Sequence, residues 1–302
     1  MKIIRAECMG FCAGVRRAVS LALDSVNNNK EGQVYTFGPL IHNSVALKNF
    51  EEKGLKIIDE SKIPIIKKKD TVVIRAHGIS PETQSSLIQT GAKILNGTCP
   101  IVQTNQKKCS DFAGNGYRII FTGDKNHGEV IGIEGAAKLN TKSKNLPFFF
   151  YLIKSENDAL ELIKKLNDEN VDFNSTKFVL LSQTTFSIIN FKKISEILQN
   201  SILNLTVVES ICPATFERQA SLDKLCGEVE GILVIGGKTS ANTSRLFSKA
   251  QKLCKNAAFI ESEDEIPEIF YEFKTVGLTA GASTPEEVVV AVEEKLKKNA
   301  KN

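Results

Sequence analysis

The stretch KILNGTC, residues 93–99, decides the fold of this 302-residue chain because it has two counterparts elsewhere in the sequence. KIIRAECMGFC occupies residues 2–12, and TVVESIC occupies residues 206–212. In each stretch a run typical of a β-strand leads to a cysteine, and a helical pattern follows the cysteine. The same order at three places indicates an internal repeat.

The repeat extends beyond the cysteines. A second strand and a polar loop with glycine follow each of them. His42 in the first loop stands 30 positions after Cys12. His127 stands 28 positions after Cys99, and Ser240 stands 28 positions after Cys212. A later strand in each copy also ends in a polar loop, and these loops contain His77, Thr184 and Ser283. We therefore divide the chain into three α/β segments, residues 1–98, 99–204 and 205–302.

Alternating strands and amphipathic helices predict α/β architecture with parallel-type sheets. No low-complexity linker separates them. The expected strands are Lys2–Arg5, Val34–Phe37, Thr71–Arg75, Arg118–Phe121, Phe178–Leu181, Ile232–Ile235 and Thr275–Leu278. The clearest helical stretches are Val15–Val26, Ser44–Lys53, Pro81–Thr90, Glu156–Leu166 and Pro285–Lys298.

Ligands of parallel sheets bind beyond the carboxyl ends of the strands, which is where the cysteines and polar loops fall. Three copies about a pseudo-threefold axis would direct all of these residues into one central cleft.

Composition restricts the function classes. Hydrophobic residues make up 42% and charged residues 25% of the chain, which are ordinary globular values. The net charge of +4 is spread along the chain, and the lysine patches 67–69 and 297–298 are short and lack aromatic neighbours, so we expect no nucleic-acid partner. The N-terminus resembles no signal peptide, and no stretch is apolar enough to span a membrane, so we expect a cytoplasmic protein with reduced cysteines.

The chain has seven cysteines, of which the three in the repeat stand apart. Cys109, Cys226 and Cys254 lie in helical runs and, with Cys8, fit buried structural residues. Cys12, Cys99 and Cys212 are expected at helix N-termini, which favour the metal-binding thiolate. Structural zinc sites use four ligands in close CxxC-type pairs, and this chain contains no CxxC sequence. Three thiolates from three segments better fit an iron–sulfur cluster with one iron that lacks a cysteine ligand.

The chain has only three histidines, and all of them fall in the strand-end loops. With the third-copy polar residues they form a donor set that suits a diphosphate, although no Walker-type loop supports a phosphate site. This donor set consists of His42, His77, His127, Ser240, Asn242 and Ser283.

Two further positions have two interpretations each. Glu129 is either a carboxylate that caps the next helix or a proton donor. Thr184 and Thr185 are either N-caps of the following helix or hydroxyl groups that contact substrate.

Nine motifs, in order, resemble those of the 4-hydroxy-3-methylbut-2-enyl diphosphate reductase family, the last enzymes of the non-mevalonate isoprenoid pathway. The resemblance covers essentially the whole chain, from Cys12 to Ser283. The motifs are MGFCAGVRRAV, FGPLIHN, VIRAHG, TCPIV, GDKNHGEV, SQTT, ICPAT, KTSANTSRL and TAGAS.

The resemblance implies one [4Fe–4S] cluster per chain on Cys12, Cys99 and Cys212, with the fourth iron free to bind the allylic hydroxyl of the substrate. It implies reductive dehydroxylation to isopentenyl and dimethylallyl diphosphate, with electrons from a donor such as flavodoxin or ferredoxin. By the same resemblance Glu129 delivers protons, Thr184 arranges the 4-hydroxyl group, Thr215 lies in the cleft, and the donor set above binds the diphosphate. A monomer or a loose homodimer is expected.

The chain departs from the family pattern at two positions. Ala241 replaces a serine between Ser240 and Asn242, which removes one hydroxyl donor, and Pro213 follows Cys212 where some members differ. Two other functions compete with the reductase: a non-enzymatic iron–sulfur redox sensor and a zinc hydrolase on the same cysteines.

Overall fold

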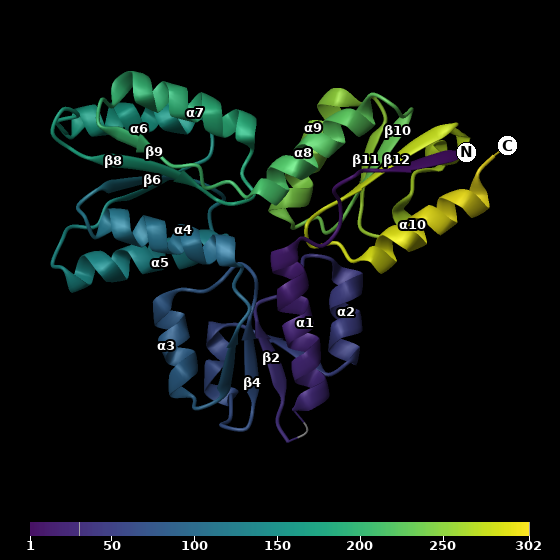
Figure 1. The fold of residues 1–302 in the computed structure, drawn as a ribbon, viewed down its shortest axis with the longest axis horizontal. Coiled ribbons are helices and arrows are strands. Elements are labelled where there is room, and N and C mark those ends of the chain that lie inside the picture. Colours follow the sequence, from purple (N-terminus) through teal and green to yellow (C-terminus); the bar gives the residue numbers. More distant parts are fainter. Residues whose placement is uncertain (30, 302) are drawn as a thin grey trace. The chain divides into compact units, whose positions relative to one another are not determined.

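The computed structural model describes residues 1–29 and 31–301; Lys30 and Asn302, in the first and third expected segments, lie outside them. Within these residues the chain forms three four-stranded sheets with only parallel pairs (Figure 1). The strands are β1 (Lys2–Arg5), β2 (Val34–Phe37), β3 (Leu55–Ile58), β4 (Thr71–Ile74), β5 (Lys93–Asn96), β6 (Arg118–Thr122), β7 (Phe150–Ile153), β8 (Phe178–Ser182), β9 (Leu205–Val207), β10 (Gly231–Ile235), β11 (Ala257–Ile260) and β12 (Thr275–Ala280).

All three sheets have the same strand order. The orders are β3-β2-β4-β5, β7-β6-β8-β9 and β11-β10-β12-β1, so the first strand after a repeat cysteine always lies between the second and the third. The fourth strand of each sheet leads to a repeat cysteine: β5 to Cys99, β9 to Cys212 and β1 to Cys12. The repeat is therefore cyclic, because the first strand of the chain completes the last sheet. The expected fold class, three repeated α/β segments with parallel sheets, is confirmed.

Strand pairing also shows where the repeats exchange strands. β9 pairs with β8 of the second sheet, and β1 pairs with β12 of the third. In the division expected from sequence, 1–98, 99–204 and 205–302, β9 belongs to the third segment but pairs in the second sheet. β1 belongs to the first segment but pairs in the third sheet.

Helices alternate with the strands, and the five clearest helices and the seven strands expected from sequence all form with ends within two residues of those expected. The α-helices are α1 (Ala13–Asn28), α2 (Ser44–Glu52), α3 (Pro81–Gln89), α4 (Pro100–Ala113), α5 (Gly128–Ser143), α6 (Glu156–Asp168), α7 (Ile188–Ser201), α8 (Pro213–Cys226), α9 (Ala241–Leu253) and α10 (Glu286–Asn299). Short 3₁₀ turns cover Glu60–Ile65, Glu263–Glu265 and Glu268–Glu272. None of the helices among the described residues has the length and apolar character that a membrane crossing requires.

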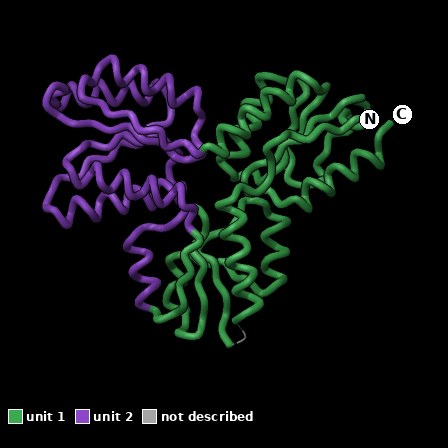
Figure 2. Tube along the Cα trace, viewed as in Figure 1, with its two compact units in different colours: residues 1–76, 90–97, 213–302 green, residues 77–89, 98–212 purple. Residues whose placement is uncertain are grey.

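The described chain divides into two compact units (Figure 2). Unit 1 contains Met1–Ala76, Thr90–Gly97 and Pro213–Asn302, and unit 2 contains His77–Gln89 and Thr98–Cys212. The sheets that contain β2 and β10 belong to unit 1, and the sheet that contains β6 belongs to unit 2.

Alternating side chains build a core on both faces of the sheets. In β10, Ile232 and Val234 pack with residues of α8 and α9, whereas Leu233 and Ile235 pack with residues of α10. In unit 2, the two faces of the central sheet are covered by α4 with α5 and by α6 with α7 (Figure 1). Strands buried on both faces appear in the sequence as continuous apolar runs. The runs ILVI (232–235) and VLL (179–181) were therefore recognisable as strands.

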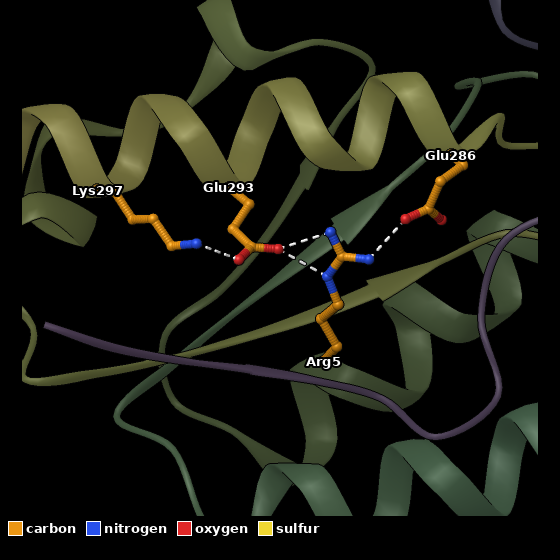
Figure 3. Close-up of polar contacts among 4 residues, drawn as sticks. All are labelled: Arg5, Glu286, Glu293 and Lys297. Atoms are coloured by element: carbon orange, nitrogen blue, oxygen red, sulfur yellow. Dashed lines mark hydrogen bonds and ion pairs between the residues drawn. The ribbon is translucent and has the colours of Figure 1, made fainter.

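Ion pairs also hold β1, the fourth strand of the last sheet, against α10. Arg5 of β1 contacts two carboxylates of α10, with Nη1 2.6 Å from Glu286 Oε1 and Nε 2.7 Å from Glu293 Oε2 (Figure 3). Lys297 donates to the other oxygen of Glu293 at 2.5 Å. The bond from Lys297, together with Arg5, holds the pKa of the Glu293 carboxyl below its ordinary value. The network therefore links the N-terminal strand to the C-terminal helix.

We expect Glu293→Gln to lower the free energy of unfolding at pH 7, by about 1 kcal/mol or less because the group is near the surface. A lowered carboxyl pKa contributes stability above the ordinary glutamate value of about 4.3, and that contribution is lost as the pH falls through the folded value. The difference from the parent in urea unfolding should thus shrink below about pH 4. Glu287→Gln is the control, because Glu287 is exposed in the first turn of the same helix; equal effects at pH 7 would contradict a role for the network.

Candidate functional site

Cys12 lies at the start of α1, in unit 1. Its backbone N–H donates to the carbonyl of Ala282 at 3.2 Å, and the N–H of Gly10 donates to that of Ala280 at 3.3 Å. Cys12 is the N-cap of α1, and its Sγ accepts a bond from the N–H of Val15 at 3.5 Å. The sulfur thus lies at a helix N-terminus, where backbone N–H groups and the helix dipole favour negative charge. Cys12 is therefore in a setting suited to a thiolate ligand.

Cys99 and Cys212 occupy the equivalent positions in unit 2. Cys99 is the N-cap of α4, and Cys212 directly precedes the first residue of α8. Each is followed by a proline, Pro100 or Pro213, whose fixed φ suits the first position of a helix. The N–H of Cys212 donates to the carbonyl of Thr184 at 2.8 Å. Like Cys12, both are partly exposed, and neither forms a disulfide bond within the described residues.

Three of the other cysteines are different. Cys109, Cys226 and Cys254 are buried. Burial raises the pKa of the Cys109 thiol to about 12 and that of Cys226 to about 11. These two side chains are thiols at neutral pH, as expected of structural residues. Cys8 is partly exposed, and its backbone N–H is bonded to Ser221 Oγ at 3.1 Å.

His42 follows β2 in unit 1. Its Nδ1 lies 3.4 Å from Thr239 Oγ1, and its carbonyl lies so near Gly237 that a Cβ there would be 1.4 Å away. Only glycine allows this approach of the two strand-end loops. Burial lowers the pKa of His42, and the positive charge of Arg75 lowers it further. The imidazole is thus predominantly neutral at pH 7.

The start of α9 and the end of β12 provide polar atoms with open bonding capacity. Ser240 is the N-cap of α9, and its Oγ accepts a bond from the N–H of Thr243 at 3.3 Å. Asn242 Nδ2 and Ser283 Oγ are buried, and neither has a hydrogen-bond partner within the described residues. Leaving a buried polar group unpaired costs about 1–3 kcal/mol. The arrangement suits a bound polar ligand, and a helix N-terminus favours an anion.

Unit 2 brings His77 and His127 together. Their rings meet edge to face with centroids 4.9 Å apart. His127 is the N-cap of α5, and its Nδ1 accepts a bond from the N–H of Glu129 at 3.2 Å. A ring nitrogen that accepts a bond carries no proton, so the proton of the neutral ring is on Nε2. His127 is therefore held as an Nε2–H donor.

Glu129 and Thr184 form a buried pair in unit 2. The Glu129 side chain accepts from the Thr184 N–H at 2.8 Å and from its hydroxyl group at 2.7 Å. Glu129 is 1% exposed, and these bonds come from the loop after β8 rather than from the first turn of α5. The following helix, α7, is capped by Ser187. Thr184 and Thr185 are therefore not its N-cap.

The loop that bears Thr184 is further fixed by Gln183. Its Nε2 donates to Thr185 Oγ1 at 2.8 Å, and its Oε1 accepts from the N–H of Asp124 at 2.9 Å. Thr215 is buried in the first turn of α8, in unit 1.

The candidate residues thus divide between the units. Unit 1 contains Cys12, His42, Ser240, Asn242 and Ser283, and unit 2 contains Cys99, Cys212, His77, His127, Glu129 and Thr184. Within residues 1–29 and 31–301, no three His, Cys, Asp or Glu side chains are placed to hold one metal ion. Joint ligation by the three cysteines therefore stays a prediction.

Two residues beside His42 were not among the expected site residues. Arg75 influences the His42 pKa, and Thr239 contacts its Nδ1. Both belong to quoted motifs, VIRAHG and KTSANTSRL, so their position in the strand-end loops was a usable signal.

Parallel sheets with thiol and polar side chains at the carboxyl ends of their strands define an α/β enzyme with candidate thiolate ligands. Over residues 3–297 the chain matches the family described as LytB protein, and it belongs to that family. A 4-hydroxy-3-methylbut-2-enyl diphosphate reductase of Treponema denticola is 39% identical over 300 residues, which cover 98% of this chain and 99% of the relative.

Solved structures agree with this assignment. One of (E)-4-hydroxy-3-methyl-but-2-enyl diphosphate reductase, the terminal enzyme of the non-mevalonate pathway, is 33% identical with a TM-score of 0.70, covering 99% of this chain and 100% of its own. The E-1-hydroxy-2-methyl-but-2-enyl-4-diphosphate reductase from Plasmodium falciparum is 25% identical with a TM-score of 0.84, covering 98% of this chain and 87% of its own. The family resemblance seen in the motifs is confirmed.

The His42 environment makes a testable prediction. We expect the His42 ring to titrate below the ordinary histidine value of about 6.5, because burial and Arg75 both disfavour the imidazolium. Arg75→Met should raise the titration midpoint of His42 toward the ordinary value without reaching it, since burial is the larger cause of the lowered pKa. Arg75→Lys keeps the positive charge and should leave the midpoint near that of the parent. NMR titration of the ring measures it; a parental midpoint at or above 6.5 would contradict this environment.

Proposed function

We propose that this chain is a 4-hydroxy-3-methylbut-2-enyl diphosphate reductase that removes the allylic hydroxyl group of its substrate. The C–O bond breaks, two electrons and two protons are taken up, and the oxygen leaves as water. The products are isopentenyl and dimethylallyl diphosphate. Membership of the LytB family and the names of full-length relatives support this reaction.

One structural observation carries the proposal. The three repeat cysteines have the same setting, each partly exposed and directly before α1, α4 or α8, whereas Cys109, Cys226 and Cys254 are buried. A recurrent thiol at a helix N-terminus has the chemistry of a soft-metal ligand.

We propose that Cys12, Cys99 and Cys212 together hold one [4Fe–4S] cluster, with the three α/β segments arranged about a pseudo-threefold axis around a central cleft. Three thiolates fit a cluster that keeps one iron free of cysteine. When bound, the cluster supplies the electrons and a Lewis-acidic iron for the hydroxyl group. The chain's own residues then bind the diphosphate, orient the alcohol and deliver protons.

The diphosphate is assigned to His42, His77, His127, Ser240, Asn242 and Ser283. The unpartnered Asn242 Nδ2 and Ser283 Oγ support this role, as does the Nε2–H of His127. Neutral donors would hold the anion by hydrogen bonds, with helix N-termini adding favourable partial charge.

Proton delivery to the substrate is assigned to Glu129, with Thr184 as its hydrogen-bond partner. Thr184 donates to Glu129 through two groups, which fixes the carboxylate and leaves the threonine oxygen able to accept a bond from a substrate hydroxyl. A buried carboxyl group with a bonded hydroxyl forms a short path for proton transfer.

We further propose an electron carrier such as flavodoxin or ferredoxin as the donor, a cytoplasmic location, and a monomer or loose homodimer. The alternative of a redox sensor receives no support from the relatives, which are named as reductases.

The deciding experiment is turnover of the anaerobically reconstituted chain with a reduced donor and the allylic diphosphate. Formation of both five-carbon diphosphates supports the reductase. A protein that takes up iron and sulfide but makes no product under any donor supports the sensor, and one that retains zinc in place of iron supports the hydrolase.

We expect Cys12→Ser, Cys99→Ser and Cys212→Ser each to lose the cluster and the activity, because a hard oxygen replaces a soft thiolate. Cys109→Ser is the matched control: it should retain both, with some loss of stability from a buried hydroxyl group. Iron content and the visible spectrum after reconstitution measure the outcome. Loss of iron from the Cys109 variant with retention in any of the other three would refute the assignment.

We expect Glu129→Gln to lower kcat by about 10²–10⁴-fold while the cluster remains, because glutamine has the shape but no transferable carboxyl proton. Substrate should still bind and perturb the spectrum. Thr184→Val should also lower kcat, because it removes the hydroxyl group that is bonded to Glu129. Turnover by Glu129→Gln within threefold of the parent would remove Glu129 from the proton path.

A further inference from the structure

Arg218 is a buried arginine in α8, within unit 1. It is 3% exposed, and its Nη1 donates to the carbonyl of Ala214 at 3.0 Å. Its Nη2 donates to the carbonyl of Gly10 at 2.6 Å, and its Nε is buried without a hydrogen-bond partner within the described residues. No carboxylate in the described part of the chain pairs with the Arg218 guanidinium. The ion pairs of unit 1 involve other residues, most of them at the surface.

A guanidinium keeps its charge at any physiological pH, and burying it is costly unless an anion or a full set of acceptors compensates it. Two carbonyl oxygens satisfy only part of its five donors. The cation is therefore incompletely compensated by the protein alone, which points to a negative group that the chain binds.

The contact with Gly10 shows where that group is. Gly10 has a φ of 71° and stands two residues before Cys12, in the turn that leads to α1. The same turn is held from the other side by Ala280 and Ala282 at the end of β12. Arg218 thus reaches the one segment of unit 1 that presents a repeat cysteine.

We propose that Arg218 is a positioning residue that fixes the Gly10–Cys12 turn and places an uncompensated positive charge beside the anionic thiolate-bound cluster. The inference rests on the proposed function, since it needs an iron–sulfur group at Cys12. Net charge and hydrogen bonding around a cluster set its reduction potential. A buried cation is weakly screened and favours the more negative, reduced state.

The test is a potentiometric titration of the reconstituted full chain, with Arg218→Gln compared with the parent. Removal of the charge should lower the equilibrium constant for one-electron reduction by about tenfold, which corresponds to about 59 mV. Arg218→Lys keeps the charge and should stay within about threefold of the parent. Arg5→Gln is the matched control, because it removes an arginine charge from the same unit that is already paired with Glu286 and Glu293.

A parental potential in Arg218→Gln, even with lower stability in urea, would overturn the proposal and leave Arg218 as a structural link. An equal shift in Arg218→Lys and Arg218→Gln would overturn it too, because the charge would not be the cause. If Arg218→Gln takes up no cluster, normal loading of Arg218→Lys supports the proposal and failed loading refutes it. A parent that binds no cluster would instead refute the proposed function.

Discussion

The pairing of β1 with β12 is the interaction on which the rest of this structure depends. It runs in parallel register from Lys2 opposite Thr275 to Arg5 opposite Leu278, and it completes the third sheet with the first residues of the chain. The bonds continue past the strand, from Gly10 to Ala280 and from Cys12 to Ala282. The pairing therefore sets the position of Cys12 relative to the loop that contains Ser283. Contacts between residues that are far apart in sequence fix the candidate ligand in this unit.

Buried polarity in these strand-end loops is the second organising feature. Glu129 and Thr184 are bonded to one another, whereas Asn242, Ser283 and Arg218 each have a buried polar atom without a hydrogen-bond partner within the described residues. A fold stabilised only by its apolar core would gain nothing from such groups. Their concentration beside the helix N-termini is consistent with the cost that enzymes accept for a preorganised binding site.

Much of this could be predicted from sequence, and the exceptions have physical causes. β6, β8 and β10 were evident because strands buried on both faces are apolar throughout. The edge strands β3, β7 and β11 were not among those expected; they are four residues long and only partly buried, so each gives a short signal. The repeat identified the cysteines and histidines. It could not decide the role of Glu129, because Thr184 stands 55 positions away and burial is a property of the fold. Arg218 was missed for the same reason, since a buried and an exposed arginine look alike in sequence.

The cyclic strand exchange has a consequence for how the chain can be cut and rejoined. β1 and α10 belong to the same unit and are linked through Arg5, and Lys301 near the end of the chain is bonded to Tyr271 in that unit. The order of the three repeats is therefore a closed circle, because the strand before Cys12 completes the third sheet. A permuted gene that joins these ends with a short linker and opens the chain between α3 and β5, or between α7 and β9, would preserve every strand pair described here. The strand pairing by itself therefore does not decide where this circle is opened.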